Sequence, residues 1–278
     1  MNNSVIDCLQ KLLNNVRGPV LVHSDMLKVG KLVDLKALGY DVRKICNQHA
    51  HFLSAAIADR NLIVPTFNYD FSQTRLFDVK NTPSQLGPFP EYFRCYCAGF
   101  RTAVPFFSFC SKDKIIVDEN EVIIKPFGEK SVFDRLYKED GCILYYGAPF
   151  CNGTTFIHYI ENYYNGLIYR YNKIFYGRVI DLNIEYDVTV SFHVRPKNYH
   201  LYYNWEKMYF DLNHIGFINR LNTAGFENIF LIKAKDMFNF FTSKLDLDPF
   251  YLLDDETKEW VMPMYKRLGQ KFLINDFE

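Results

Sequence analysis

The stretch SVFDRLYKEDGCILYYGAPFCNGTTFIHYIE, residues 131–161, decides the fold because it predicts a helix, a strand and a second helix in succession. Ser131 is a suitable N-cap for the first helix, and Gly141 is a suitable residue to end it. The apolar run at residues 142–147 then predicts a buried strand. Helix and strand in alternation are typical of a layered α/β domain.

The first part of the chain repeats this alternation. A helix beginning near Ser4 is followed by a short buried strand, Val20–His23. A helix-like segment containing Gly39 comes next, and a second buried strand, Leu62–Val64, is stopped by Pro65. We therefore expect several strands of one sheet, covered by the intervening helices.

Other segments depart from this pattern. The proline-rich residues 80–111 predict a long irregular loop, which in a compact domain is usually functional. A hairpin is expected around Asp118-Glu119-Asn120, and residues 170–195 predict two antiparallel strands. The remainder predicts short helices and one strand near NIFLIKA. We expect a single domain over residues 1–278, with about 170–278 as a candidate subdomain.

Composition argues against a nucleic-acid binder and favours ring-lined pockets. The 278 residues contain 32 Lys+Arg and 32 Asp+Glu, so the chain lacks the cationic surplus of a nucleic-acid binder. Aromatic residues make up 17%, with 20 Tyr and 26 Phe, which suits ring-lined pockets.

The cysteines and the N-terminus bear on location. Seven scattered cysteines without a paired Cys-x-x-Cys motif indicate reduced thiols, as in a cytoplasm. The start of the chain lacks a signal-peptide pattern, and no run of 18 apolar residues occurs. We expect a cytoplasmic protein.

His158 is the first candidate for chemistry. With Thr154 or Thr155 as N-cap, it falls near the start of its helix, and Glu161 lies three residues on, close enough to interact. A neutral imidazole there is able to take a proton, with the carboxylate stabilising the resulting imidazolium. An isolated His-x-x-Glu is nevertheless more often structural, so a packed or capping histidine remains the alternative.

Ser24 and Lys28 follow the first strand at the sheet edge where α/β proteins bind ligands. They can hold a phosphate or carbonyl group, or Ser24 can be an ordinary helix cap. His49 and His51 alternate as strand residues do and lack a third ligand, so we expect a strand there and no metal site. No Gly-x-Ser-x-Gly elbow or phosphate-binding glycine loop occurs.

Taken in order, four stretches resemble the aminoglycoside 3-N-acetyltransferase (antibiotic N-acetyltransferase) family. They are VLVHSDMLKVG (20–30), LIVPTFNYDF (62–71), FRTAVPFFSF (100–109) and FGEKSVFDRLYKEDGCILYYGAPFCNGTTFIHYIE (127–161). The family typically shows V-H-S-S-L-x-x-x-G, M-P-T-F/Q-x-W, R-x-x-H-P-x-x-S, and F-G-x-x-S-P followed by T-x-x-H-x-A-E. The last block is the most specific, because it keeps order, spacing and chemistry over some thirty residues.

The resemblance implies an α/β layered domain around a mixed β-sheet, with a β-rich C-terminal portion, rather than the GNAT fold. It implies acyl transfer from acetyl-CoA, or from a larger thioester such as 3-hydroxybutanoyl-CoA, to a sugar amine. His158 matches the family's base, with Glu161 as its nearest carboxylate; Glu185 and Asp187 are further candidates for that support. It also implies thioester contacts at Ser24 and Ser108, and places Asp70 near the acceptor amine.

Some positions depart from the family pattern, and they bear on the acceptor. Val104 replaces the histidine of H-P-x-x-S, and Asp25 replaces the second serine of V-H-S-S. Aminoglycosides are polycations, whereas Arg94 and Arg101 suit phosphate. We therefore expect a nucleotide-linked amino sugar of surface polysaccharide (O-antigen) biosynthesis as acceptor. An aminoglycoside, or a non-catalytic protein that binds CoA or a partner, is the alternative.

Overall fold

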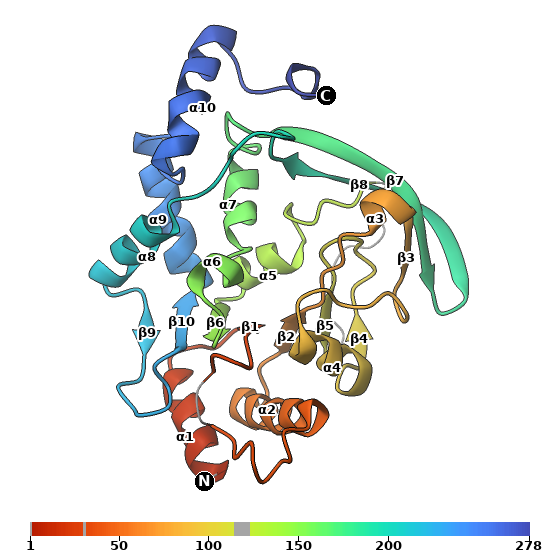
Figure 1. The fold of residues 1–278 in the computed structure, drawn as a ribbon, viewed down its shortest axis with the longest axis vertical. Helices are drawn as coiled ribbons and strands as arrows, with labels where there is room; N and C mark the ends of the chain where they lie inside the picture. The colour runs from red at the N-terminus through yellow and green to blue at the C-terminus, as the bar shows by residue number, and fades with distance from the viewer. Residues whose placement is uncertain (1, 30–31, 114–122) are drawn as a thin grey trace.

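A computed structural model describes residues 2–29, 32–113 and 123–278, and its centre is a seven-stranded mixed sheet of order β4-β5-β2-β1-β6-β10-β9 (Figure 1). The strands are β1 Val20–Ser24, β2 Leu62–Pro65, β4 Phe100–Arg101, β5 Phe109–Ser111, β6 Cys142–Tyr146, β9 Asn219–Arg220 and β10 Ile229–Lys233. Strand β1 is parallel to β2 and β6, whereas β5 and β10 run antiparallel to their neighbours β2 and β6. The predicted mixed-sheet α/β fold is confirmed.

The described residues also form ten α-helices and one 3₁₀ turn. They are α1 Asn2–Leu12, α2 Val42–Ile57, α3 Phe71–Thr74, α4 Pro88–Tyr96, α5 Val132–Lys138, α6 Phe150–Gly153, α7 Ile157–Tyr163, α8 Trp205–His214, α9 Ala234–Leu247, α10 Asp255–Leu268 and the 3₁₀ turn Ile274–Asp276. Ser131 caps α5 as expected, since its side chain accepts from the Asp134 N–H at 3.2 Å.

The sheet separates two apolar cores. Leu21 and Ile143 face one core together with residues of α5, α7 and α9, whereas Val22 and Leu144 face the other with residues of α1, α2 and α4. Both faces of the central strands are therefore buried, which explains why these strands read as continuous apolar runs. Helices therefore pack against both faces of the main sheet and hold its strands in place.

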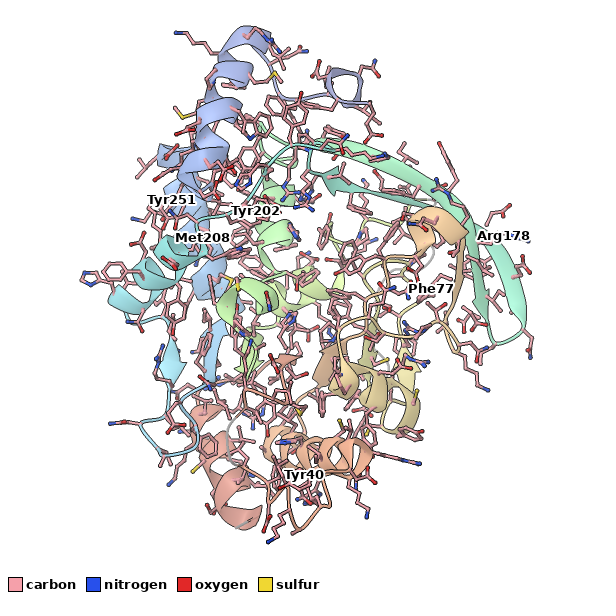
Figure 2. All side chains as sticks on the ribbon, in the orientation of Figure 1. Tyr40, Phe77, Arg178, Tyr202, Met208 and Tyr251 are labelled. Carbon is pink, nitrogen blue, oxygen red and sulfur yellow. The ribbon has the colours of Figure 1, made fainter. Side chains whose placement is uncertain are left out.

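A second sheet has the order β3-β7-β8 and is dominated by a long hairpin. Its strands are β3 Leu76–Asp78, β7 Tyr171–Asp181 and β8 Ile184–Val194. Leu182 and Asn183 form the two-residue turn with φ of 47° and 75°, which matches the twist of the paired strands. The hairpin extends from the body of the molecule, with Arg178 far from Tyr202 (Figure 2). The two predicted antiparallel strands are confirmed.

The structure corrects several local predictions. Residues 80–111 are not wholly irregular, since they contain α4, β4 and β5. The HAH sequence at 49–51 lies in helix α2, not in a strand. Neither Thr154 nor Thr155 caps α7, whose N-cap position is Phe156. The threonine hydroxyls instead bond Tyr145, the Phe150 carbonyl and His23. The hairpin expected around residues 118–120 lies outside the described residues.

Three buried histidines predict a loss of stability in acid. Burial lowers the pKa of His23, His49 and His193 to about 4 each. Unfolding restores a pKa near 6.5, so the unfolded chain binds more protons between about pH 6.5 and 4, and stability falls as pH falls. Each histidine contributes up to about 1.4 kcal/mol per pH unit in that window.

Urea unfolding at pH 7 and pH 5 measures this slope. We expect His49→Gln to flatten it, because one buried titrating ring is removed. The control His51→Gln changes an exposed ring of the same helix and is expected to leave the slope intact. Equal slopes in all three proteins would contradict the prediction.

Candidate active site

His158 and Glu161 form a close pair on helix α7. The Nδ1–H of His158 donates to Oε2 of Glu161 at 2.7 Å, so in the neutral imidazole Nε2 carries no hydrogen. The His158 side chain is 24% exposed, whereas that of Glu161 is 0% exposed. No group in the described part of the chain bonds Nε2, and His158 lines a pocket. The carboxylate thus fixes the ring, and the free nitrogen is able to accept a proton.

Glu161 is the centre of a buried hydrogen-bond network. Its Oε1 accepts from the Arg170 Nε–H at 2.9 Å and from the Tyr203 hydroxyl, and its Oε2 accepts from His158 and, at 3.3 Å, from His193. Burial alone would raise the pKa of Glu161, but the Arg170 charge and the histidine hydrogen bonds outweigh it and hold the pKa well below its usual range. Glu161 is therefore an ionised carboxylate with every oxygen satisfied.

Of the carboxylates considered from the sequence, Glu161 is the one in contact with His158. Glu185 pairs with Arg178 on the outer hairpin. His193 faces Glu161 from β8, and burial lowers its pKa to about 4, so it is a neutral donor there. Arg170, His193 and Tyr203 were not predicted. Arg170 and His193 both lie in the predicted strand pattern of residues 170–195, whereas Tyr203 lies outside it and carried no signal.

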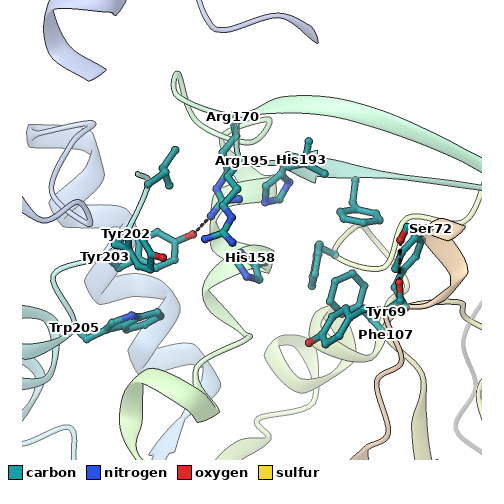
Figure 3. A pocket seen from close by; sticks show the side chains of 15 residues that line it. Tyr69, Ser72, Phe107, His158, Arg170, His193, Arg195, Tyr202, Tyr203 and Trp205 are labelled. Carbon is teal, nitrogen blue, oxygen red and sulfur yellow. Dashed lines mark hydrogen bonds between the residues drawn. The ribbon is translucent and has the colours of Figure 1, made fainter. Parts of the chain in front are cut away.

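The pocket beside His158 has a volume of about 450 Å³ (Figure 3). Its charged lining residues are Arg170 and Arg195, and no Asp or Glu is among the residues described as lining it. Its wall is mostly aromatic: Tyr69, Phe106, Phe107, Phe127, Phe192, Tyr202, Tyr203 and Trp205. The rings come from separate regions of the chain, so the tertiary fold alone assembles the pocket.

The ligand atoms of His158, Glu161 and His193 lie within 4.8 Å of one another, close enough to hold a metal ion. Two histidines and one glutamate are also the donor set of some catalytic zinc sites. Here the carboxylate already accepts from both rings, and the Arg170 guanidinium binds its other oxygen. A divalent cation would have to displace these hydrogen bonds next to the buried Arg170 charge. The arrangement therefore fits a histidine base oriented by a carboxylate better than a metal site.

The candidate thioester contacts Ser24 and Lys28 lie at the C-terminal end of β1 and just beyond it. The Ser24 hydroxyl is buried and has no hydrogen-bond partner in the described chain. Lys28 is exposed and pairs with Asp25 at 3.3 Å. His23 Nε2 lies 3.1 Å from the Thr155 hydroxyl, which joins this strand end to the turn before α7. The structure therefore brings β1 and the His158 helix to one edge of the sheet.

Ser108 and Arg101 are not brought to the pocket. Ser108 is fully buried; its hydroxyl donates to the Thr66 carbonyl at 2.8 Å and accepts from the Arg101 Nε–H at 3.1 Å. Arg101 also donates to the carbonyls of Val79, Thr82 and Thr66 at 3.0, 2.6 and 3.0 Å. These two side chains link the 79–82 segment to the main sheet through hydrogen bonds. Ser108 was expected to contact the thioester and Arg101 the acceptor, and neither side chain lies in the pocket.

We expect Arg101→Gln to lower the free energy of unfolding by about 3 kcal/mol, because it removes several hydrogen bonds from a buried cation. The Michaelis constants of the remaining folded enzyme should be unchanged. Urea unfolding, and steady-state kinetics well below the melting midpoint, measure the two effects. A raised acceptor KM at unchanged stability would restore Arg101 to substrate binding.

Asp70 and Arg94 also lie outside the pocket lining. Asp70 is exposed and accepts from the Gln85 amide at 2.9 Å; its neighbours Tyr69 and Ser72 line the pocket instead. Arg94 pairs with Glu91 on α4 at 2.6 Å. The prediction for Asp70 is therefore close, since its neighbours line the pocket although Asp70 itself does not. Arg94, which was expected to bind substrate, instead forms an ion pair within its own helix.

The comparisons with known proteins agree on family and fold. A family model described as aminoglycoside 3-N-acetyltransferase matches residues 21–246. The solved apoenzyme of aminoglycoside acetyltransferase AAC(3)-IVa is 21% identical with a TM-score of 0.65, covering 91% of each chain. AAC-IIIb bound to CoASH is 14% identical with a TM-score of 0.71, covering 89% of this chain and 96% of that one. YokD from Bacillus subtilis is 16% identical with a TM-score of 0.63, covering 88% and 98%.

At these identities the likeness to solved structures establishes the fold. No curated protein matches the sequence. Among the helices of the described residues, none has the length and apolar character needed to cross a membrane.

Proposed function

Because this chain belongs to the aminoglycoside 3-N-acetyltransferase family of CoA-dependent N-acetyltransferases, we propose that it transfers an acyl group directly from a CoA thioester to an amine, with His158 as general base. The observation that carries the proposal is the His158 ring itself. Its Nδ1–H is fixed by a buried carboxylate, and its Nε2 is free beside a pocket.

In this reaction the substrate ammonium first releases one proton to water, and the neutral amine attacks the thioester carbonyl carbon. His158 Nε2 takes the second proton from the attacking nitrogen, and the Glu161 charge stabilises the imidazolium that forms. The carbon–sulfur bond then breaks, and the imidazolium returns a proton to the leaving thiolate. No cysteine is needed as an acyl carrier.

The proposed co-substrate is acetyl-CoA or 3-hydroxybutanoyl-CoA, with Ser24 and Lys28 among its contacts. The buried Ser24 hydroxyl supports this, because it has no hydrogen-bond partner in the described chain. A buried hydroxyl without a partner destabilises the fold unless a ligand or water forms the missing hydrogen bond. The position of both residues at the C-terminal edge of the sheet supports it as well.

The proposed acceptor is an amino sugar carried on a nucleotide, as used in surface-polysaccharide biosynthesis. The charge of the pocket supports an anionic acceptor: no carboxylate lines it in the described chain, and its lining cation Arg195 forms no ion pair there, whereas Arg170 is paired with Glu161. Glu161 lies behind this surface and is neutralised by Arg170. A polycation would gain no ion pair from this wall and would meet like charge.

An aminoglycoside is the second candidate acceptor, and the comparisons favour it. The solved relatives include a variant of AAC(3)-IVa in complex with apramycin, at 17% identity and a TM-score of 0.64. Calorimetry with UDP- and dTDP-linked amino sugars and with apramycin separates the two candidates. Binding of the nucleotide sugar supports the first; tight apramycin binding with none to any nucleotide sugar would overturn it.

A further inference from the structure

A second pocket, of about 540 Å³, adjoins the one that contains His158. The two share the lining residues Val194, Arg195 and Tyr202. Arg195 follows the last residue of β8 directly and is exposed. A ligand whose amine lies at His158 can therefore extend past Arg195 into the second pocket.

The cations of the second pocket differ in their partners. Lys173 pairs with Glu278, and His200 lies 3.2 Å from Asp254 and 3.4 Å from Glu256. Arg195 and Lys197 form no ion pair with any carboxylate of the described chain.

The Arg195 guanidinium faces an aromatic ring rather than an acid. Its central carbon lies 5.7 Å from the centroid of the Tyr202 ring. Arg195 thus lies where the two pockets meet and Lys197 lines the second pocket, and neither of these exposed cations forms an ion pair in the described chain.

We propose that Arg195 and Lys197 form a diphosphate-binding subsite for the acceptor, an inference that rests on the function proposed above. A guanidinium presents a planar fork of donors that matches phosphate oxygens in pairs, and a lysine adds a point charge. The sugar then lies at His158, the diphosphate at Arg195, and the nucleoside in the second pocket.

The aromatic residues of the second pocket suit this arrangement. Tyr202 lines both pockets and is 50% exposed, and Phe175 and Tyr199 line the second one. A planar base can stack on such rings. The only carboxylate among the described lining residues, Glu278, is engaged by Lys173 and by the Tyr171 hydroxyl, so it leaves Arg195 free for an anion.

CoA also carries a diphosphate, so the test must separate the two sources. Calorimetry measures UDP, dTDP and CoA separately against the wild type, Arg195→Gln and Arg195→Lys. We expect Arg195→Gln to weaken UDP or dTDP binding about tenfold or more, Arg195→Lys to weaken it less, and neither to alter CoA binding more than about twofold. Arg195 is exposed, so both variants should fold.

The matched control is Arg178→Gln, an exposed arginine of the same hairpin that lines neither pocket. It should bind all three ligands as the wild type does. Equal nucleotide affinity in wild type and Arg195→Gln, or an effect confined to CoA, would overturn the subsite.

These binding measurements need no turnover. If acyl transfer to an amine depends on His158 while Arg195 variants bind nucleotides normally, the subsite fails and the proposed function stands. If no amine is acylated but nucleotide binding depends on Arg195, the proposed function fails and the anion site remains.

Discussion

Glu161→Gln is expected to lower the free energy of unfolding by about 3–5 kcal/mol, because it leaves a buried guanidinium without its counter-charge. The side chains of Arg170 and Glu161 are 7% and 0% exposed, and their Nε–Oε1 distance is 2.9 Å. The amide nitrogen would also present a donor to groups that now donate to the carboxylate. Urea unfolding at pH 7, monitored by circular dichroism, measures the loss.

The matched control is Glu185→Gln, which removes the partner of Arg178 on the outer hairpin. There the side chains are 45% and 59% exposed, so water screens the pair and we expect a change below about 1 kcal/mol. Similar small losses in both variants would show that Glu161 is not the electrostatic centre of the site.

His158→Ala is expected to lower kcat about 10²–10⁴-fold, the usual contribution of general-base catalysis. The Michaelis constant for the thioester should change little, because the proton is taken from the amine. The fold should survive, since three donors to Glu161 remain: Arg170, His193 and Tyr203. Steady-state thiol release with the best acceptor measures kcat and KM separately.

The control for this variant is His51→Ala, an exposed histidine of helix α2. It should retain wild-type kcat. A kcat for His158→Ala that stays close to the wild-type value would return His158 to a structural role.

Local patterns were enough to predict most of the main sheet. The runs at β1, β2 and β6 are apolar because both faces of these strands are buried. Such continuous apolar runs can be recognised from the sequence alone. The hairpin β7–β8 was predictable from its β-branched and aromatic residues. Helix α4 was not, because Pro88 and Pro90 suggest a loop, although proline is well tolerated in a first helical turn.

The site was predictable only in part. His158 and Glu161 are three residues apart on one helix, so local geometry brings them together. Arg170 and Tyr203 reach Glu161 from 9 and 42 residues away, and no local pattern encodes such contacts. Motif order likewise could not tell which way a side chain points: Ser108 and Arg101 match their motif positions but are buried against Thr66.

The most direct test of the account is an acyl-transfer assay on wild type and His158→Ala. Acetyl-CoA and 3-hydroxybutanoyl-CoA are offered with UDP- and dTDP-linked amino sugars and one aminoglycoside. We predict that the wild type releases one thiol for each amine acylated, and that His158→Ala abolishes most of this turnover. Unchanged turnover in the variant would contradict the role of His158, and silence of the wild type with every acceptor would favour a protein that binds CoA or a partner without catalysis.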